Sequence, residues 1–225
     1  MSRSFFLLIA WFLCCTTDSL TQKTSKQLLA EGYKRYPIPH CTITYELSGQ
    51  HQGTETIFFD RYGLRETKLT NTEIKAGSMS VKTNTLTIMD GEITYSVDLD
   101  KKTGSKITNT LLTTLTQKLD EKDLAKMGET MMKRMGAKKT GTGDVAGKKC
   151  DVWEVSSFGT STWVWNAITL KSETNMAGMK IRNAASKVDE SAIPEEKFAL
   201  PTDVVFEDKG SVQDAMKKMK QGKKK

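Results

Sequence analysis

Alternating hydrophobic and polar positions dominate the chain from Cys41 onward. In residues 41–48, apolar side chains recur at every second position from Cys41 to Leu47, with threonine and glutamate between them. Successive side chains of a strand point to opposite faces, so this pattern predicts a half-buried strand. Similar runs, separated by Gly, Asp or Asn, predict strands over residues 55–60, 64–74, 79–89, 93–99, 105–109, 149–155, 161–166, 168–174 and 179–188. The rhythm indicates a mainly β, α+β fold with an antiparallel meander.

Three segments depart from this rhythm. The pattern predicts a short helix over residues 25–36 that ends at Pro37. Over residues 111–139 it predicts a helical insertion of two helices, the second capped by Asp120. Thr140 to Gly147 reads as a glycine-rich loop. We expect a single domain over residues 21–208, followed by a short helix and a basic tail over residues 209–225.

The first 20 residues have the layout of a secretory signal peptide. A positive start precedes an uncharged apolar run from Phe5 to Cys15. A helix that spans a bilayer needs about 20 apolar residues, so this run is too short. We expect export with cleavage near Ser19, against the alternatives of a retained anchor or of lipidation at Cys14 or Cys15, before which no small residue stands.

The net charge of +7 is concentrated at the C-terminus, where Lys217, Lys218, Lys220, Lys223, Lys224 and Lys225 lie. Without these six lysines the charge falls to about +1, so the body is nearly neutral and nucleic acid is not an expected partner. The tail either keeps the protein soluble or is attracted to an anionic membrane surface.

Catalytic and metal-binding chemistry is poorly represented. The two histidines, His40 and His51, have no recognisable partner, and no nucleophile motif is present. His40 and Cys41 are adjacent, but no clustered set completes a metal site. We predict a protein that is not an enzyme and that needs no metal and no cofactor.

The distinctive side chains are apolar. Trp163 and Trp165 share one face of a predicted strand, and Trp153 lies on the strand before it. Met127, Met131, Met132 and Met135 cluster in the predicted insertion, and methionine adapts to ligands of varied shape. Both sets are either ordinary core or the lining of an apolar cavity. For the second case, the candidate ligand-binding residues are Trp153, Trp163, Trp165, Met127, Met131 and Met135.

Two cysteines, Cys41 and Cys150, lie outside the signal peptide. An even number of cysteines in an oxidising compartment favours pairing, so a Cys41–Cys150 disulfide is one of two open alternatives.

Several motifs of the chain resemble an uncharacterised family of exported bacterial proteins. They are Ile43-Thr-Tyr45 to Gly49, Phe59-Asp60-x-Tyr-Gly63, Asp90-Gly91, Ala146-Gly147 to Trp153, and Trp163-Val-Trp165 to Lys171-Ser-Glu. The resemblance covers most of residues 41–201. That family looks related to the periplasmic lipoprotein carriers and their outer-membrane receptors. It therefore implies an incomplete β-barrel whose apolar cavity is covered by helices, with residues 111–139 as the lid.

These observations predict an exported binding protein of the cell envelope, periplasmic or associated with the outer membrane, that holds a lipid or another apolar ligand in a half-barrel. The alternative is a structural or protein-interaction module of the envelope whose core is filled by its own side chains. Fold alone does not decide between them.

Overall fold

The computed structural model describes residues 22–76, 79–110, 122–176 and 178–212. The predicted signal peptide, residues 111–121 and the six tail lysines lie outside these residues. Two α-helices and twelve strands are described: α1(Ser25–Ala30), β1(Cys41–Gly49), β2(His51–Asp60), β3(Arg65–Ala76), β4(Met79–Asp90), β5(Ile93–Asp98), β6(Thr103–Thr108), α3(Leu124–Arg134), β7(Lys138–Val145), β8(Lys148–Val155), β9(Thr160–Trp165), β10(Ile168–Met176), β11(Met179–Asp189) and β12(Val205–Ser211). No described helix is long and apolar enough to cross a membrane.

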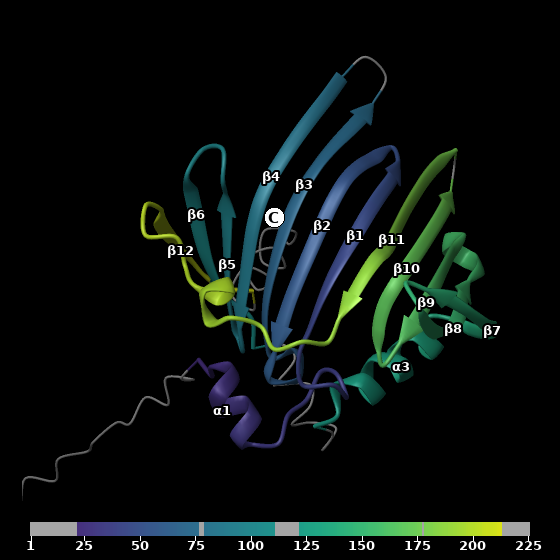
Figure 1. Ribbon diagram of the computed structural model, residues 1–225, viewed down its shortest axis with the longest axis horizontal. Coiled ribbons are helices and arrows are strands. Elements are labelled where there is room, and N and C mark those ends of the chain that lie inside the picture. Colours follow the sequence, from purple (N-terminus) through teal and green to yellow (C-terminus); the bar gives the residue numbers. More distant parts are fainter. Residues whose placement is uncertain (1–21, 77–78, 111–121, 177, 213–225) are drawn as a thin grey trace, which may run out of the picture.

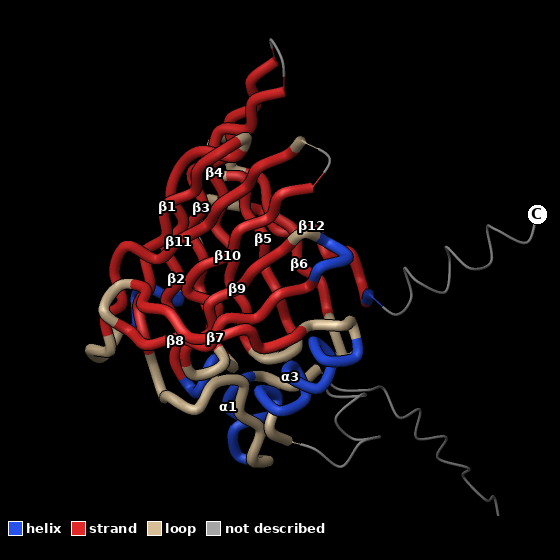
Figure 2. Tube along the Cα trace, turned by 90° about the vertical axis from the view of Figure 1, so that its right-hand side faces the viewer, coloured by secondary structure: helices blue, strands red, loops and turns tan. Residues whose placement is uncertain are grey.

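All described strands belong to one open, curved sheet (Figure 1). Its order is β12-β6-β5-β4-β3-β2-β1-β11-β10-β9-β8-β7, so neighbours in sequence are mostly neighbours in the sheet. Both helices lie at one end of the sheet, and the long β3–β4 hairpin extends toward the other (Figure 2). The prediction of a mainly β fold with a curved sheet is confirmed, and the described strands pair antiparallel except for β12 with β6.

The main core lies where β7 to β11 curl toward β1 and β2. Its buried members are Cys41, Ile43, Tyr45, Phe59, Val145, Cys150, Ile168, Leu170 and Ala185. Alternation puts Cys41, Ile43 and Tyr45 on one face of β1, as the sequence predicts. A smaller core joins α1 and α3 through Leu28, Tyr33, Leu64, Leu124 and Met127.

Two strands were not predicted. The expected loop over Thr140 to Gly147 is wrong, because β7 pairs with β8 across residues 138–145. Gly143 is needed there, since a Cβ would lie 2.9 Å from Nε1 of Trp163. The helix expected from residue 209 onward is also wrong up to Ser211, because β12 pairs in parallel with β6.

The helix expected over residues 25–36 ends early, at Ala30, and this early end determines where Tyr36 lies. A capping box of Thr24 and Gln27 begins α1, and Gly32, with a φ of 91°, follows its end. The amides of Arg35 and Tyr36 instead donate to the carbonyl oxygen of Tyr62, at 3.0 and 2.9 Å. The chain therefore runs from α1 to β1 in an extended form.

A long connection returns from β11 to β12 across the base of the sheet (Figure 1). Parallel pairing of β12 with β6 requires such a crossover. The connection is held midway by Arg65 on β3, whose guanidinium pairs with Glu195 and lies 4.0 Å from the ring centroid of Phe198. It therefore links the middle of the sheet to its far edge.

Candidate functional site

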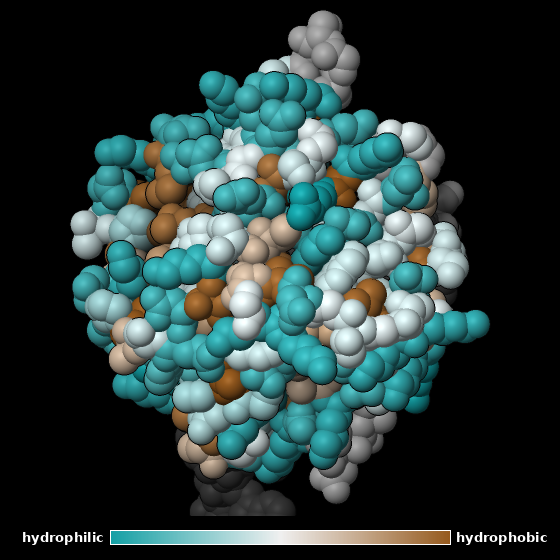
Figure 3. All heavy atoms as spheres, turned by 45° about the vertical axis from the view of Figure 1, so that its right-hand side comes forward, coloured by the Kyte–Doolittle hydropathy of each residue, from teal (hydrophilic) through white to brown (hydrophobic). Residues whose placement is uncertain are grey.

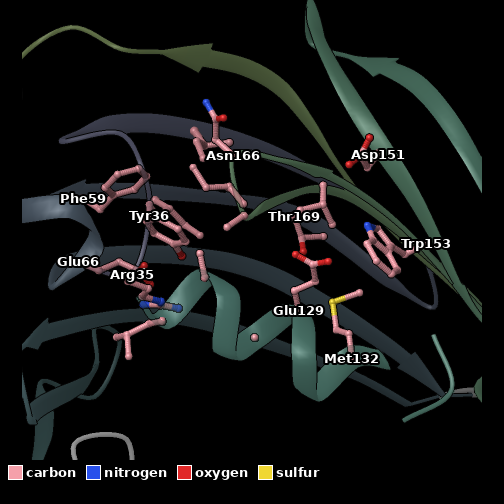
Figure 4. A pocket seen from close by; sticks show the side chains of 18 of the residues that line it. Arg35, Tyr36, Phe59, Glu66, Glu129, Met132, Asp151, Trp153, Asn166 and Thr169 are labelled. Atoms are coloured by element: carbon pink, nitrogen blue, oxygen red, sulfur yellow. Dashed lines mark hydrogen bonds and ion pairs between the residues drawn. The ribbon is translucent and has the colours of Figure 1, made fainter. Parts of the chain in front are cut away.

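A cavity of about 720 Å³ lies between α3 and the curved sheet (Figure 4). Strands β1, β2 and β3 form one side, and the β8–β10 segment forms another. Glu129 and Met132 point into it from α3, Trp153 approaches from β8, and Tyr36 and Phe59 lie at the opposite end. Ligand pockets in proteins commonly measure about 300–1,000 Å³, so the volume suits a small molecule.

The part of the lining that lies against β1 and β2 is aromatic and aliphatic. Ile43 and Ile57 face each other across the two strands, and the rings of Tyr36 and Phe59 are 4.7 Å apart. The hydroxyl of Tyr45 donates to the carbonyl oxygen of Thr169 at 3.0 Å. Burial raises the pKa of Tyr36 to about 12 and also raises the pKa of Tyr45. Both phenols therefore stay uncharged at neutral pH.

The charged residues of the lining are paired. Nη1 of Arg35 lies 3.1 Å from Oε2 of Glu66, and Nζ of Lys68 lies 3.6 Å from Oε2 of Glu55. The other two carboxylates of the lining also have cations: Lys133 lies 2.7 Å from Glu129, and Lys139 lies 2.9 Å from Asp151. Because these charges compensate one another, the lining does not select strongly for an ionic ligand.

Helix α3 presents one side to the cavity. Asp123 caps its first turn, with a carboxylate oxygen that accepts from the amides of Ala125 and Lys126 at 3.0 and 3.2 Å. Leu124, Gly128 and Met132 then recur at intervals of four residues and line the cavity. The expectation that Asp120 caps this helix is wrong for α3.

The predicted ligand-binding methionines lie elsewhere on the same helix. Met127 is buried in the smaller core. Met131 and Met135 are 48% and 54% exposed and are not among the residues that line the cavity. Met132, which was not among the predicted ligand-binding residues, lines the cavity instead.

The three tryptophans separate in the same way. Trp153 lines the cavity, whereas Trp163 and Trp165 pack against the main core. Pairing of Trp153 with Thr162 and of Val152 with Trp163 puts Trp153 and Trp163 on opposite faces of β8 and β9. Nζ of Lys171 lies 3.8 Å from the ring centroid of Trp163. Nζ of Lys148 lies 4.8 Å from the ring centroid of Trp165. The core interpretation therefore fits Trp163 and Trp165.

Sequence reasoning also missed Tyr36, Tyr45 and Phe59. Alternation along β1 and β2 carried a signal for Tyr45 and Phe59, since both share a face with buried neighbours. Tyr36 carried none, because its place depends on the early end of α1.

Cys41 and Cys150 are both buried in the main core and are free thiols, which is the unpaired one of the two open alternatives. Burial raises the pKa of Cys41 to about 11 and also raises the pKa of Cys150. Thiolates are the reactive form, so neither cysteine is set up as a nucleophile. Among the described residues, no group of three or more His, Cys, Asp or Glu side chains could hold a metal ion.

Comparisons with known proteins give distant similarities of fold. No family model and no curated protein matches the chain. Of the solved structures, MucB is 14% identical with a TM-score of 0.43, and the alignment covers 80% of this chain and 63% of MucB. An uncharacterized conserved protein from Thermus thermophilus is 8% identical with a TM-score of 0.47, covering 82% of this chain and 99% of that one. LprF from Mycobacterium bovis is 7% identical with a TM-score of 0.35, covering 81% of this chain and 94% of LprF.

Proposed function

We propose that the protein is an exported cell-envelope binding protein that holds a lipid or another apolar ligand between α3 and the curved sheet, without catalysing a reaction. The observation that carries this proposal is the cavity of about 720 Å³, which has a helix on one side and, on the strands opposite, aromatic and aliphatic side chains beside paired charges. Compensated charges near these side chains leave burial of apolar surface as the main source of affinity.

The expected affinity follows from the transfer of an acyl chain out of water. Each buried methylene contributes about 0.8 kcal/mol, so six methylenes contribute about 5 kcal/mol before the cost of association is subtracted. A chain of this kind would lie beside Ile43, Ile57 and Met132. Helix α3 would act as the lid over the bound chain.

The location proposed for this activity is the periplasm or the outer membrane. The apolar N-terminal run supports export, and the lysines at the C-terminus supply a charge that anionic lipids attract. A protein at this location could take an apolar ligand from one membrane surface and carry it through water.

Two methionines of α3 allow a matched test. Met132→Lys places an ammonium group in the cavity, whereas Met131→Lys places the same group on the exposed side of the same helix. Fluorescence titration with cis-parinaric acid as the probe should give binding at least about tenfold weaker for Met132→Lys, because the bound apolar chain would take the added ammonium group out of water. Met131→Lys should bind as the unchanged protein does.

Circular dichroism controls for folding in both variants. Equal binding by the two variants would place the probe outside the cavity and contradict the proposal. Absence of binding in the unchanged protein would favour the alternative, a structural or interaction module of the envelope without a ligand.

A further inference from the structure

A second hollow, of about 380 Å³, lies at the end of the sheet away from α1 and α3. It is formed where the β8–β9 turn, the β10–β11 hairpin and the β1–β2 turn come together. Its lining includes Gly49, Gly159, Glu173, Lys180 and Arg182. None of these residues lines the cavity beside α3, so the hollow is a separate feature of the molecule.

Backbone hydrogen bonds join the turns that form the hollow. The amide of Asn175 donates to the carbonyl oxygen of Gly159 at 2.9 Å, and the amide of Gln50 donates to that of Lys180 at 3.1 Å. Gly49 has a φ of 97°, and a Cβ there would lie 2.0 Å from the carbonyl oxygen of Lys180. The close backbone approach fixes the position of the side chains around the hollow.

Two large exposed apolar residues are the direct sequence neighbours of residues that line this hollow. Phe158 ends the η2(Ser156–Phe158) turn immediately before Gly159 and is 52% exposed. Met176 follows Asn175 at the end of β10 and is 44% exposed. The Gly159–Asn175 hydrogen bond keeps the two turns adjacent. The face of the molecule seen in Figure 3 is mostly hydrophilic, with hydrophobic residues in separate patches.

The charge around the hollow is positive. Glu173 lies 2.9 Å from Lys171 and 3.4 Å from Arg182, so its carboxylate is shared by two cations. Lys180 forms no ion pair within the described part of the chain and is exposed. In the lining of the hollow, two cations, Lys180 and Arg182, stand against one carboxylate, Glu173, which leaves a charge of about +1 that favours an anionic partner.

We propose that this end of the sheet docks on the surface of an anionic phospholipid bilayer. Phe158 and Met176 enter the boundary between headgroups and acyl chains, and Lys180 and Arg182 contact lipid phosphates at the hollow. Exposed apolar side chains beside basic ones bind membrane surfaces by combining buried apolar area with attraction to anionic lipid. This inference is independent of the cavity and of the lysine tail.

Vesicle sedimentation tests the proposal on the mature full-length chain in which the six tail lysines are replaced by glutamine. Vesicles are made of phosphatidylcholine alone or of phosphatidylcholine mixed with phosphatidylglycerol. The Phe158→Asp, Met176→Asp double variant should bind the mixed vesicles about tenfold more weakly, because it removes apolar contact and adds negative charge. Val205→Asp is the matched control, since Val205 is 88% exposed on β12 and lies at the other edge of the sheet.

The Lys180→Gln variant should weaken binding to the mixed vesicles and leave the weak binding to phosphatidylcholine unchanged. A second measurement uses Phe158→Trp, whose added fluorescence should be quenched by brominated acyl chains. Equal binding by the double variant and by Val205→Asp, absence of vesicle binding by the glutamine-tail chain, or no quenching at position 158 would each overturn the proposal. If the true partner is instead a charged soluble protein, the glutamine-tail chain will not bind vesicles.

Discussion

At the scale of single residues, Arg65 connects three parts of the protein. Its Nε lies 2.8 Å from Oδ1 of Asp60, and its Nη2 lies 2.7 Å from Oε2 of Glu195. The guanidinium also lies over the ring of Phe198 at 4.0 Å. Arg65 itself is buried, so its charge depends on these partners more than an exposed arginine would. It holds the crossover connection against the sheet.

The Arg65–Glu195 pair makes stability depend on pH. Arg65 lowers the pKa of Glu195 from 4.5 to about 2. Because the pKa is lower in the folded state, the stabilisation is present above about pH 4.5 and is lost as the pH falls toward about 2. Glu195→Gln should therefore be less stable than the unchanged protein at neutral pH, and the difference should vanish near pH 2.

Urea unfolding at several pH values measures this difference. Glu195 is 77% exposed, so solvent screens much of the interaction and the effect at neutral pH should be small. A difference that stays constant down to pH 2 would show that Glu195 acts through packing and not through its charge.

The state of Cys41 and Cys150 gives a second prediction at this scale. As free thiols in the core, both should resist a thiol reagent in the folded protein and both should react after unfolding in denaturant. A chain that begins at residue 21, and so lacks Cys14 and Cys15, should therefore show two reactive thiols in denaturant. No reaction in denaturant without a reductant would instead show that the two cysteines pair.

Predictions for single residues of the site succeeded only where the sequence pattern shows which way a side chain points. Trp153 lines the cavity, but Trp163 and Trp165, which looked equivalent in the sequence, lie on the other face of the paired strands. Which tryptophans share a face depends on the register between β8 and β9, and alternation within one strand does not reveal this register. The methionines raised the same difficulty, because neighbouring positions of a helix point in different directions.

At the scale of elements, ten of the twelve described strands follow from alternation and turn residues. The two missed strands have physical reasons. Glycine weakens strand propensity in β7, although Gly143 makes room for the indole of Trp163. Parallel pairing of β12 with β6 depends on a long crossover, which leaves no local signal. Local pattern therefore predicts the meander but not its final strand.

The docking of β12 should depend on a small residue in β6. A Cβ at Gly104 would lie 2.7 Å from Cδ1 of Phe206 and 2.8 Å from Cγ1 of Val204. Gly104→Ala should therefore push β12 away and loosen the edge contact of Phe206 with Tyr95, whose ring centroids are 5.2 Å apart. We expect a loss of about 1–3 kcal/mol in unfolding free energy.

Hydrogen exchange locates this change. Amides of β12 and β6 should exchange faster in Gly104→Ala, while those of β1 and β2 should keep their protection. Gly141→Ala on β7 is the control, because a Cβ there meets nothing within 4 Å. Uniform loss of protection in Gly104→Ala would mean that β12 does not detach separately.

At the scale of the whole molecule, the curved sheet separates two features. The cavity lies beside α3 near one end, and the basic hollow with Phe158 and Met176 lies at the other. In the proposed account, one end holds an apolar ligand and the other contacts the membrane. A protein arranged in this way could exchange its ligand at a membrane surface while its body stays in water.

Native mass spectrometry of the mature protein, purified from its own envelope fraction and followed by lipid extraction, tests the central claim most directly. The account predicts a stoichiometric apolar ligand that is retained by Met131→Lys and lost from Met132→Lys. An apo mass for the unchanged protein, or a ligand retained equally by both variants, would contradict it.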